Sequence, residues 1–304
     1  MSEAVDQRRG VDASQASEGF SEARVQAMRA DPRLGDAIRH SVLTSLSYYD
    51  EAPVMHRNLK DVGRFVLGVV ALYLDATGGL THRRLREMSG QTGLISTGAA
   101  TALLVRLRLI GYVCAAEVMP SGATRLYRPT PAMTAAFRER LRIELTASAM
   151  LDPRIQPLLD RLREPEVFPT LMTTVGADAV NAARNPRPDA AAIDRLSLRT
   201  AGMLIMFQLL ADADDGGAFP PVGGEVEVSI SGLARRFEVS RSHVLSVLRE
   251  AEALSLISRV DEGLWRIEPA LSEVFKTFYA VLYMGVIKAA RAAQAALATG
   301  RRRR

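Results

Sequence analysis

An internal repeat is the feature that most constrains the fold of this 304-residue chain. Residues 127–137 align without a gap with residues 265–275, and aromatic, Arg, Pro, Ala and Phe residues recur in register. Two shorter matches lie in the same order: Asp31-Pro32-Arg33-Leu34 with Asp152-Pro153-Arg154-Ile155, and Arg108-Leu109-Ile110 with Ser255-Leu256-Ile257. Ordered matches of this kind indicate one structural unit present twice. The competing interpretation is a coincidence of common helix-start residues.

The length and the 48% hydrophobic content of the chain allow two domains, each with a core of its own. Residues 1–20 mix polar and charged residues without an apolar period, so we expect a disordered N-terminal lead. We place the first unit at residues 21–150 and the second at residues 151–300. Residues 301–304 are a basic tail of four arginines.

The hydrophobic pattern predicts a mainly α fold with small β-hairpins. In the first half, a helix after Pro53 has an apolar stripe from Leu59 to Leu74, and helices follow near residues 82–88 and 96–109. A hairpin is then expected at residues 111–115 and 124–128, before a helix over 132–150. The second half repeats this order and ends in a long helix over 270–299. We expect the apolar faces of the two terminal helices to pack together.

Residues 233–257 carry the most specific pattern in the chain. Apolar residues at 233, 237, 239, 244, 247, 248, 251 and 254 can hold two helices against each other across a tight turn at Glu238-Val239. Ser240 can cap the second of these helices. Its exposed face would then project Arg241, Ser242 and Arg249. This is the arrangement that a helix-turn-helix requires.

Residues 233–257 resemble the winged helix-turn-helix of bacterial transcription regulators, most closely the multiple-antibiotic-resistance-regulator (MarR-like) group. The shared pattern is Leu-Ala, a spacer, Val-Ser-Arg-Ser, apolar helical steps and a closing Leu-Ile, here without a gap. The wing would be residues 258–261 and 264–267. Leu245 departs from the pattern, because a polar residue is common there, and Ser258 replaces a frequent Gly. Together with the internal repeat, the resemblance implies two tandem winged helix-turn-helix units related by internal duplication, which bind double-stranded DNA.

The resemblance also implies which residues contact DNA, with the second helix of each unit in the major groove. In the second unit they are Ser240, Arg241, Ser242, His243, Leu245, Ser246 and Arg249 on the helix, with Arg259 and Arg266 on the wing. In the first unit they are Ser96, Thr97 and Arg106 on the corresponding helix, Arg83, Arg84 and Arg86 on the preceding helix, and Arg125 and Arg128 on the wing. Two alternatives stay open: the second unit's motif is structural or protein-binding, or the first unit's helix packs on a partner subunit.

Composition limits the remaining classes of function. The net charge of +5 and the pI near 9.6 fit nucleic-acid binding without requiring it. The single cysteine, Cys114, excludes an intramolecular disulfide and favours a reducing cytosol. We expect no metal or cofactor, because the four histidines have no metal-ligand spacing. We also expect no membrane span, because the longest apolar run, Thr277–Ile287, is about half the ~20 residues that a spanning helix needs.

The leading hypothesis is a cytoplasmic, nucleoid-associated transcription regulator in which two winged helices of one chain act as a pseudo-dimer. A homodimer or a protein partner is also compatible with the sequence. A replication initiator of the plasmid type, which also uses tandem winged helices, and a winged-helix interaction scaffold are the alternatives. An enzyme is the least favoured class, because no nucleophile and base, carboxylate pair or cofactor motif can be assembled.

Overall fold

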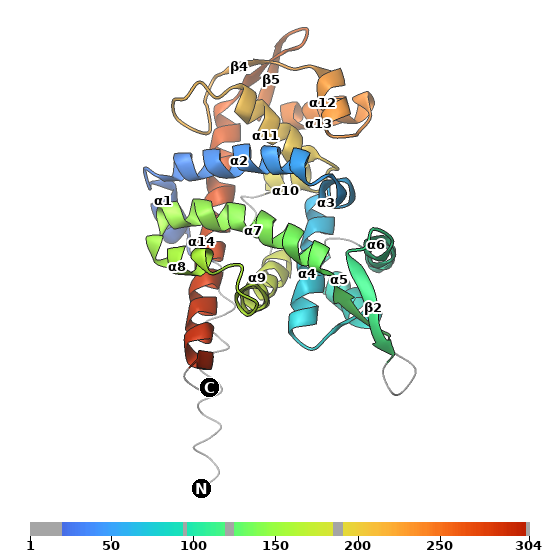
Figure 1. The fold of residues 1–304 in the computed structure, drawn as a ribbon. Coiled ribbons are helices and arrows are strands. Elements are labelled where there is room, and N and C mark those ends of the chain that lie inside the picture. The colour runs from blue at the N-terminus through green and yellow to red at the C-terminus, as the bar shows by residue number, and fades with distance from the viewer. Residues whose placement is uncertain (1–19, 94–95, 119–124, 185–190, 302–304) are drawn as a thin grey trace.

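The protein is mainly helical and carries two small three-stranded antiparallel sheets, as a computed structural model shows (Figure 1). The structure describes residues 20–93, 96–118, 125–184 and 191–301. The expectation of a mainly α fold with small β-hairpins is therefore confirmed. The expected lead at 1–20 and the basic tail at 301–304 lie outside the described residues, apart from Phe20 and Arg301.

The first half contains seven helices and three strands among its described residues. They are α1 (Glu22–Arg29), α2 (Leu34–Glu51), α3 (Pro53–Asn58), α4 (Val62–Ala76), β1 (Leu80–Thr81), α5 (His82–Thr92), α6 (Thr97–Leu109), β2 (Val113–Val118), β3 (Arg125–Pro129) and α7 (Pro131–Leu151). The single helix expected after Pro53 is wrong, because two helices occur there. Asp61 accepts a hydrogen bond from the backbone N–H of Arg64 at 2.9 Å and so begins α4 as a separate helix.

The second half continues directly from the end of α7. Its elements are the 3₁₀ helix η1 (Pro153–Ile155), α8 (Gln156–Asp160), α9 (Val167–Arg184), α10 (Ala191–Ser197), α11 (Gly202–Asp212), β4 (Glu225–Glu227), α12 (Ile230–Arg236), α13 (Arg241–Ala253), β5 (Ile257–Asp261), β6 (Leu264–Ile267) and α14 (Pro269–Arg301). One continuous cluster of buried apolar side chains runs through both halves.

The two sheets have the same strand order. The first is β1-β3-β2 and the second is β4-β6-β5, so the last strand of each half lies in the middle. Tyr127 pairs with Leu80 in the first sheet, and Trp265 pairs with Val226 in the second. Both halves therefore share a seven-element order, in which a helix, a strand, two helices, two strands and a helix follow one another.

The predicted match of Arg108-Leu109-Ile110 with Ser255-Leu256-Ile257 is shifted by three residues. Val113 pairs with Pro129 as Ile257 pairs with Ile267, so residues 255–257 correspond to residues 111–113. The turn after each helix has a left-handed residue, Gly111 at φ 75° and Ser255 at φ 56°. The shift arose because the Leu-Ile match ignored this turn, which needs a residue that tolerates positive φ.

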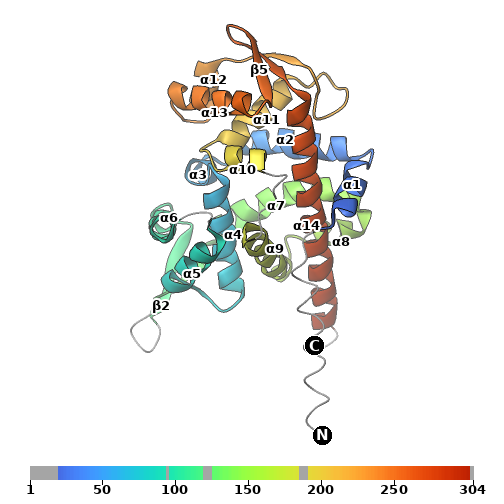
Figure 2. The same ribbon diagram turned by 180° about the vertical axis from the view of Figure 1, so that it is seen from behind.

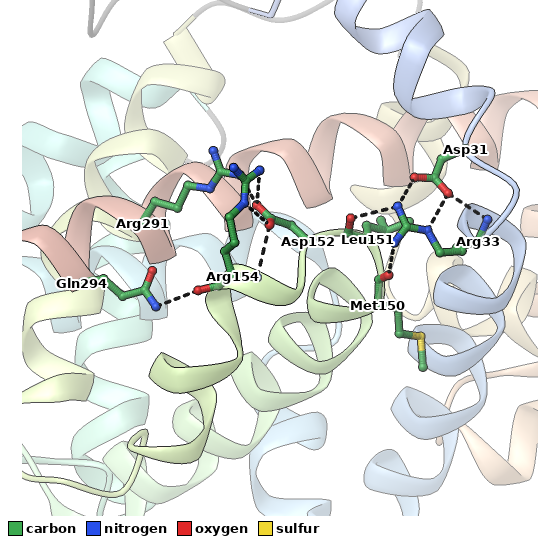
Figure 3. Close-up of polar contacts among 8 residues, drawn as sticks. All are labelled: Asp31, Arg33, Met150, Leu151, Asp152, Arg154, Arg291 and Gln294. Atoms are coloured by element: carbon green, nitrogen blue, oxygen red, sulfur yellow. Dashed lines mark hydrogen bonds and ion pairs between the residues drawn. The ribbon is translucent and has the colours of Figure 1, made fainter.

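The two Asp-Pro-Arg matches adopt the same local geometry (Figure 3). The Asp31 carboxylate accepts hydrogen bonds from the backbone N–H and the Nε–H of Arg33, at 2.9 and 3.0 Å. The Asp152 carboxylate does the same with Arg154, at 3.3 and 2.8 Å. Hydrogen bonds from the arginine hold the pKa of Asp31 below its ordinary value. Each motif thus forms a small closed turn at a helix start.

Each of these motifs also contacts a terminal helix. The Arg33 guanidinium donates to the carbonyl oxygens of Met150 and Leu151, at 3.0 and 3.1 Å, where α7 ends. Arg291 of α14 donates to the Asp152 carboxylate, and Gln294 donates to the carbonyl oxygen of Arg154 at 3.0 Å (Figure 3). The motif at Asp31 therefore binds α7, the last helix of the first half, and the motif at Asp152 binds α14, the last helix of the second half.

Helix α14 passes along both halves. It packs against α1, α2, α7 and α9, so the expected contact between the two terminal helices is present. Residues 269–300 are long and apolar enough to cross a bilayer by length and composition, and 44% of their most apolar window is buried inside the protein. Both a buried core helix and a membrane span meet that test. Contacts with these helices and with α10 cover part of the apolar face of α14.

A buried polar network joins α14 to α2 and α7. Glu144 of α7 pairs with Arg140 at 2.6 Å, and the two side chains are 7% and 20% exposed. Ser41 of α2 donates to the other oxygen of Glu144 at 2.8 Å. The Tyr283 hydroxyl of α14 lies 2.8 Å from Ser41 Oγ and 2.8 Å from the carbonyl oxygen of Ala37. Burial raises the pKa of Tyr283 well above its ordinary value, so the hydroxyl stays neutral and can donate.

Replacing Glu144 with Ala should lower the free energy of unfolding by about 3 kcal/mol, because Arg140 would keep a charge in the core without its partner. Urea denaturation measures this difference. Glu139 pairs with Arg142 on the same helix at 2.6 Å, but both side chains are about 40% exposed. Glu139→Ala is therefore the matched control and should cost less than about 0.5 kcal/mol. Equal losses in the two variants would contradict the role assigned to the network.

His56 makes the free energy of unfolding depend on pH. Its ring lies between Tyr48 and Tyr49, with centroid distances of 5.2 and 4.9 Å. Burial lowers the pKa of His56 to about 4, from 6.5 in an unfolded chain. Between pH 6.5 and 4, His56 is therefore mostly protonated in the unfolded chain but mostly neutral in the folded protein.

The wild-type protein should lose about 2 kcal/mol of unfolding free energy through His56 between pH 7 and pH 5. His56→Phe keeps an aromatic ring between the tyrosines and removes the titration. Chemical denaturation of both proteins at the two pH values measures the difference. If the variant loses as much stability as the wild type, another group is responsible.

Candidate nucleic-acid interface

Helix α13 has one buried face and one exposed polar face. Ser240 caps it by accepting a hydrogen bond from the backbone N–H of His243 at 3.1 Å. Arg241, Ser242 and Arg249 are exposed. Neither arginine forms a hydrogen bond or ion pair with any residue that the structure describes. The buried face consists of Val244, Val247, Leu248 and Ala251. The exposed face can therefore offer two free guanidinium groups and a hydroxyl to a ligand.

Two predicted contact residues on α13 are already engaged within the protein. The His243 ring Nε2 lies 2.7 Å from the carbonyl oxygen of Thr200, so the ring points toward the loop before α11. The ring nitrogen is therefore engaged within the protein, and a contact of His243 with DNA stays a prediction. The Ser246 hydroxyl accepts a hydrogen bond from Arg199 at 2.5 Å but stays exposed. Leu245 is half-buried.

Arg195 and Arg199 are basic residues near α13 that the sequence analysis missed. Both pair with Glu250 of α13, at 3.0 and 3.4 Å. The Arg195 side chain is 62% exposed, so it adds positive charge beside the exposed face. Arg195 lies in α10, and Arg199 lies two residues after the end of that helix. No local pattern links them to α13, because about fifty residues separate the two segments.

The hairpin of the second unit is less basic than expected. Arg266 pairs with Glu225 of the neighbouring strand at 2.6 Å. Arg259 donates through Nε to the carbonyl oxygen of Asp261 at 3.3 Å. Asp261 and Glu262 lie next to each other where β5 ends, and both are exposed. These carboxylates offset the charge of the arginines, and the contact of Arg259 and Arg266 with phosphate stays a prediction.

Helix α6 is the counterpart of α13, with the same length of 13 residues and a serine cap at the same position. Ser96 accepts a hydrogen bond from the backbone N–H of Ala99 at 3.1 Å. Its exposed residues include the small or apolar Thr97, Gly98, Ala102, Val105 and Leu109, and near its end the arginines Arg106 and Arg108. The side chains of Val105 and Leu109 are 49% and 82% exposed. Where α13 has Arg241 and Arg249, α6 has Thr97 and Val105.

The predicted basic residues of the first unit fall into two groups. Arg84 donates to the carbonyl oxygens of Gly79 and Thr77, at 2.6 and 3.4 Å, and so binds the end of α4. Arg106 donates to the side-chain oxygen of Asn58 in α3. In this first group the guanidinium binds another segment of the protein, and its contact with DNA stays a prediction. The second group is exposed and consists of Arg83, which pairs with Glu87 at 2.7 Å, together with Arg86, Arg125 and Arg128. Arg106 is exposed as well.

Helices α6 and α13 lie on one side of the molecule in both views, one above the other, with α3 between them (Figures 1 and 2). The β5–β6 hairpin lies at one end of this series and the β2–β3 hairpin at the other. A ligand that contacts both helices must therefore be elongated. Within the described residues, no three His, Cys, Asp or Glu side chains could together hold a metal ion.

Comparisons of the chain with models of protein families, with curated proteins and with solved structures found no match.

Replacing Arg84 with Ala should lower the free energy of unfolding by about 1–2 kcal/mol, because two backbone carbonyl oxygens lose a charged donor. Arg86→Ala is the matched control on the same helix. Arg86 is exposed and forms no hydrogen bond or ion pair with a described residue, so its loss should change stability by less than about 0.5 kcal/mol. Urea denaturation compares the two variants. Equal stability would show that Arg84 does not secure the end of α4.

Proposed function

We propose that this protein is a transcription regulator that binds double-stranded DNA through α6 and α13, two winged helices of one chain. The observation that carries the proposal is the exposed face of α13. A serine-capped helix that follows a tight turn presents Arg241, Ser242 and Arg249 to solvent, and neither arginine has a partner among the described residues. Guanidinium groups on the exposed face of such a helix suit the acceptor atoms of guanine in the major groove.

We also propose that the two units arose by duplication and act as a covalent pseudo-dimer. The support is the shared seven-element order, the shared strand order and the two serine-capped helices of 13 residues. The matched Asp-Pro-Arg turns add a local correspondence. Two like units in one chain offer DNA two binding surfaces without a second subunit.

The two surfaces would recognise different sequences. Helix α13 offers charged donors, whereas the exposed face of α6 offers methyl and methylene groups at Ala102, Val105 and Leu109. Apolar groups in the major groove can contact the methyl group of thymine. The exposed Arg86, Arg125 and Arg128 would supply phosphate contacts to that half. The preferred site is therefore an asymmetric inverted repeat, in which the half bound by α13 contributes more affinity.

Selection of binding sites from a random pool of duplexes tests the proposal, and footprinting across the genome shows where such sites lie. Enriched promoter sites would support regulation in the cytoplasm at the nucleoid. Enriched direct repeats beside an origin would favour a replication initiator instead. If neither method enriches any sequence, DNA recognition is refuted, and an interaction scaffold becomes the better proposal.

Replacing Arg241 with Ala should weaken binding to the selected site by about 1–3 kcal/mol and relax its sequence preference. Arg163→Ala removes the same charge from an exposed position outside α6 and α13 and is the matched control. Its affinity should stay near that of the wild type. Electrophoretic mobility shifts at several salt concentrations measure both variants, because phosphate contacts make affinity fall steeply with salt. Unchanged affinity and specificity in Arg241→Ala would refute the role of α13.

A further inference from the structure

The segment between α3 and α4 contacts the tight turn between α12 and α13. We call residues 57–61 the α3–α4 link. The Lys60 ammonium donates to the carbonyl oxygens of Phe237 and Glu238, at 3.0 and 3.1 Å. Its side chain is only 9% exposed. The last carbonyl oxygens of a helix have no partner within the helix, so Lys60 supplies the missing donor at the end of α12.

Further contacts hold the same turn. Arg57 pairs with the Glu238 carboxylate at 2.7 Å, and the ring of Tyr49 packs against Phe237 at 5.2 Å. The backbone carbonyl oxygen of Lys60 accepts a hydrogen bond from the N–H of Ala201 at 3.0 Å. The link therefore binds the second half both at the turn before α13 and at the start of α11. Glu238 has φ 50°, so the turn itself is a constrained conformation.

The link is equally attached to the first half. Arg106 of α6 donates to Asn58 of α3, two residues before Lys60. Asp61, one residue after Lys60, caps α4. A continuous series of contacts thus runs from α6 through α3 and Lys60 to the turn that precedes α13. The position of α3 between the two helices is visible in both views (Figures 1 and 2).

We propose that the α3–α4 link is a rigid brace that sets the separation of α6 and α13, so that the protein accepts two half-sites at one spacing only. This inference rests on the proposed function. One base pair of added spacer moves a half-site by about 3.4 Å and rotates it by about 35° around the duplex. Rigidly braced helices cannot follow that displacement, whereas loosely joined helices can. Lys60 acts here as a positioning residue that does not itself contact DNA.

Duplexes that carry the two selected half-sites at different spacings test the brace, together with a duplex that carries only the half-site bound by α13. The wild type should lose about tenfold or more in affinity when the spacer changes by one base pair. Lys60→Met keeps most of the side-chain volume and removes the donor. The affinity of this variant should fall less than about threefold when the spacer changes by one base pair. Its affinity for the single half-site should equal that of the wild type.

Lys288→Met is the matched control, because Lys288 pairs with Asp178 at 3.0 Å away from the link. It should keep the wild-type dependence on spacing. Hydrogen exchange without DNA gives a second readout. Backbone amides at 237–240 should exchange about tenfold faster in Lys60→Met and unchanged in Lys288→Met. If Lys60→Met fails to fold, Arg57→Ala weakens the same contact at a side chain that is 59% exposed.

A spacing dependence that is equally steep in the wild type and the link variants would overturn the brace while leaving the proposed function intact. Faster exchange at the turn with unchanged spacing preference would overturn it as well, because the link would then stabilise the turn without setting the separation. Absence of binding even to the single half-site would refute the proposed function, and the spacing proposal with it.

Discussion

The buried polar network around Glu144 is the directional constraint that fixes α14 of the second half against α2 and α7 of the first half. Apolar contacts have no preferred direction, and they would allow several packings of α2, α7 and α14. A carboxylate that is 7% exposed permits far fewer, because Ser41 and Arg140 must both reach it. Tyr283 extends the same network to α14. The long terminal helix of the second half is thereby fixed against the first half.

This fixed core has a consequence for the surface. Because one cluster of buried side chains runs through both halves, α6 and α13 belong to one body. The α3–α4 link adds direct contacts between the halves beside α13, through Lys60 and Arg57. The two exposed helices therefore present a ligand with a single geometry. In a dimer of separate subunits, the same geometry would depend on protein concentration.

The candidate site could be predicted in part, and the difference between the residues has a physical cause. Ser240 caps α13 as expected, because a cap depends on residues only three positions away, and Ser96 caps α6 in the same way. The exposure of Arg241 and Arg249 follows from helical periodicity in the same way. The internal partners of Arg106 and His243 could not be predicted, because Asn58 and Thr200 are more than forty residues away from them. The acidic neighbours of Arg266 also come from another strand.

The sequence by itself determined the helices, the hairpins and the outward face of α13, since these depend on local periodicity, capping and turn residues. The repeated Asp-Pro-Arg motif likewise forms the same turn twice. Only the tertiary structure decided the separate start of α4, the true correspondence of the two halves and the partners of Arg84, Arg106 and His243. It also decided that Lys60 lies against the turn before α13. These contacts join segments remote in sequence, and such pairings are set by how the whole core packs.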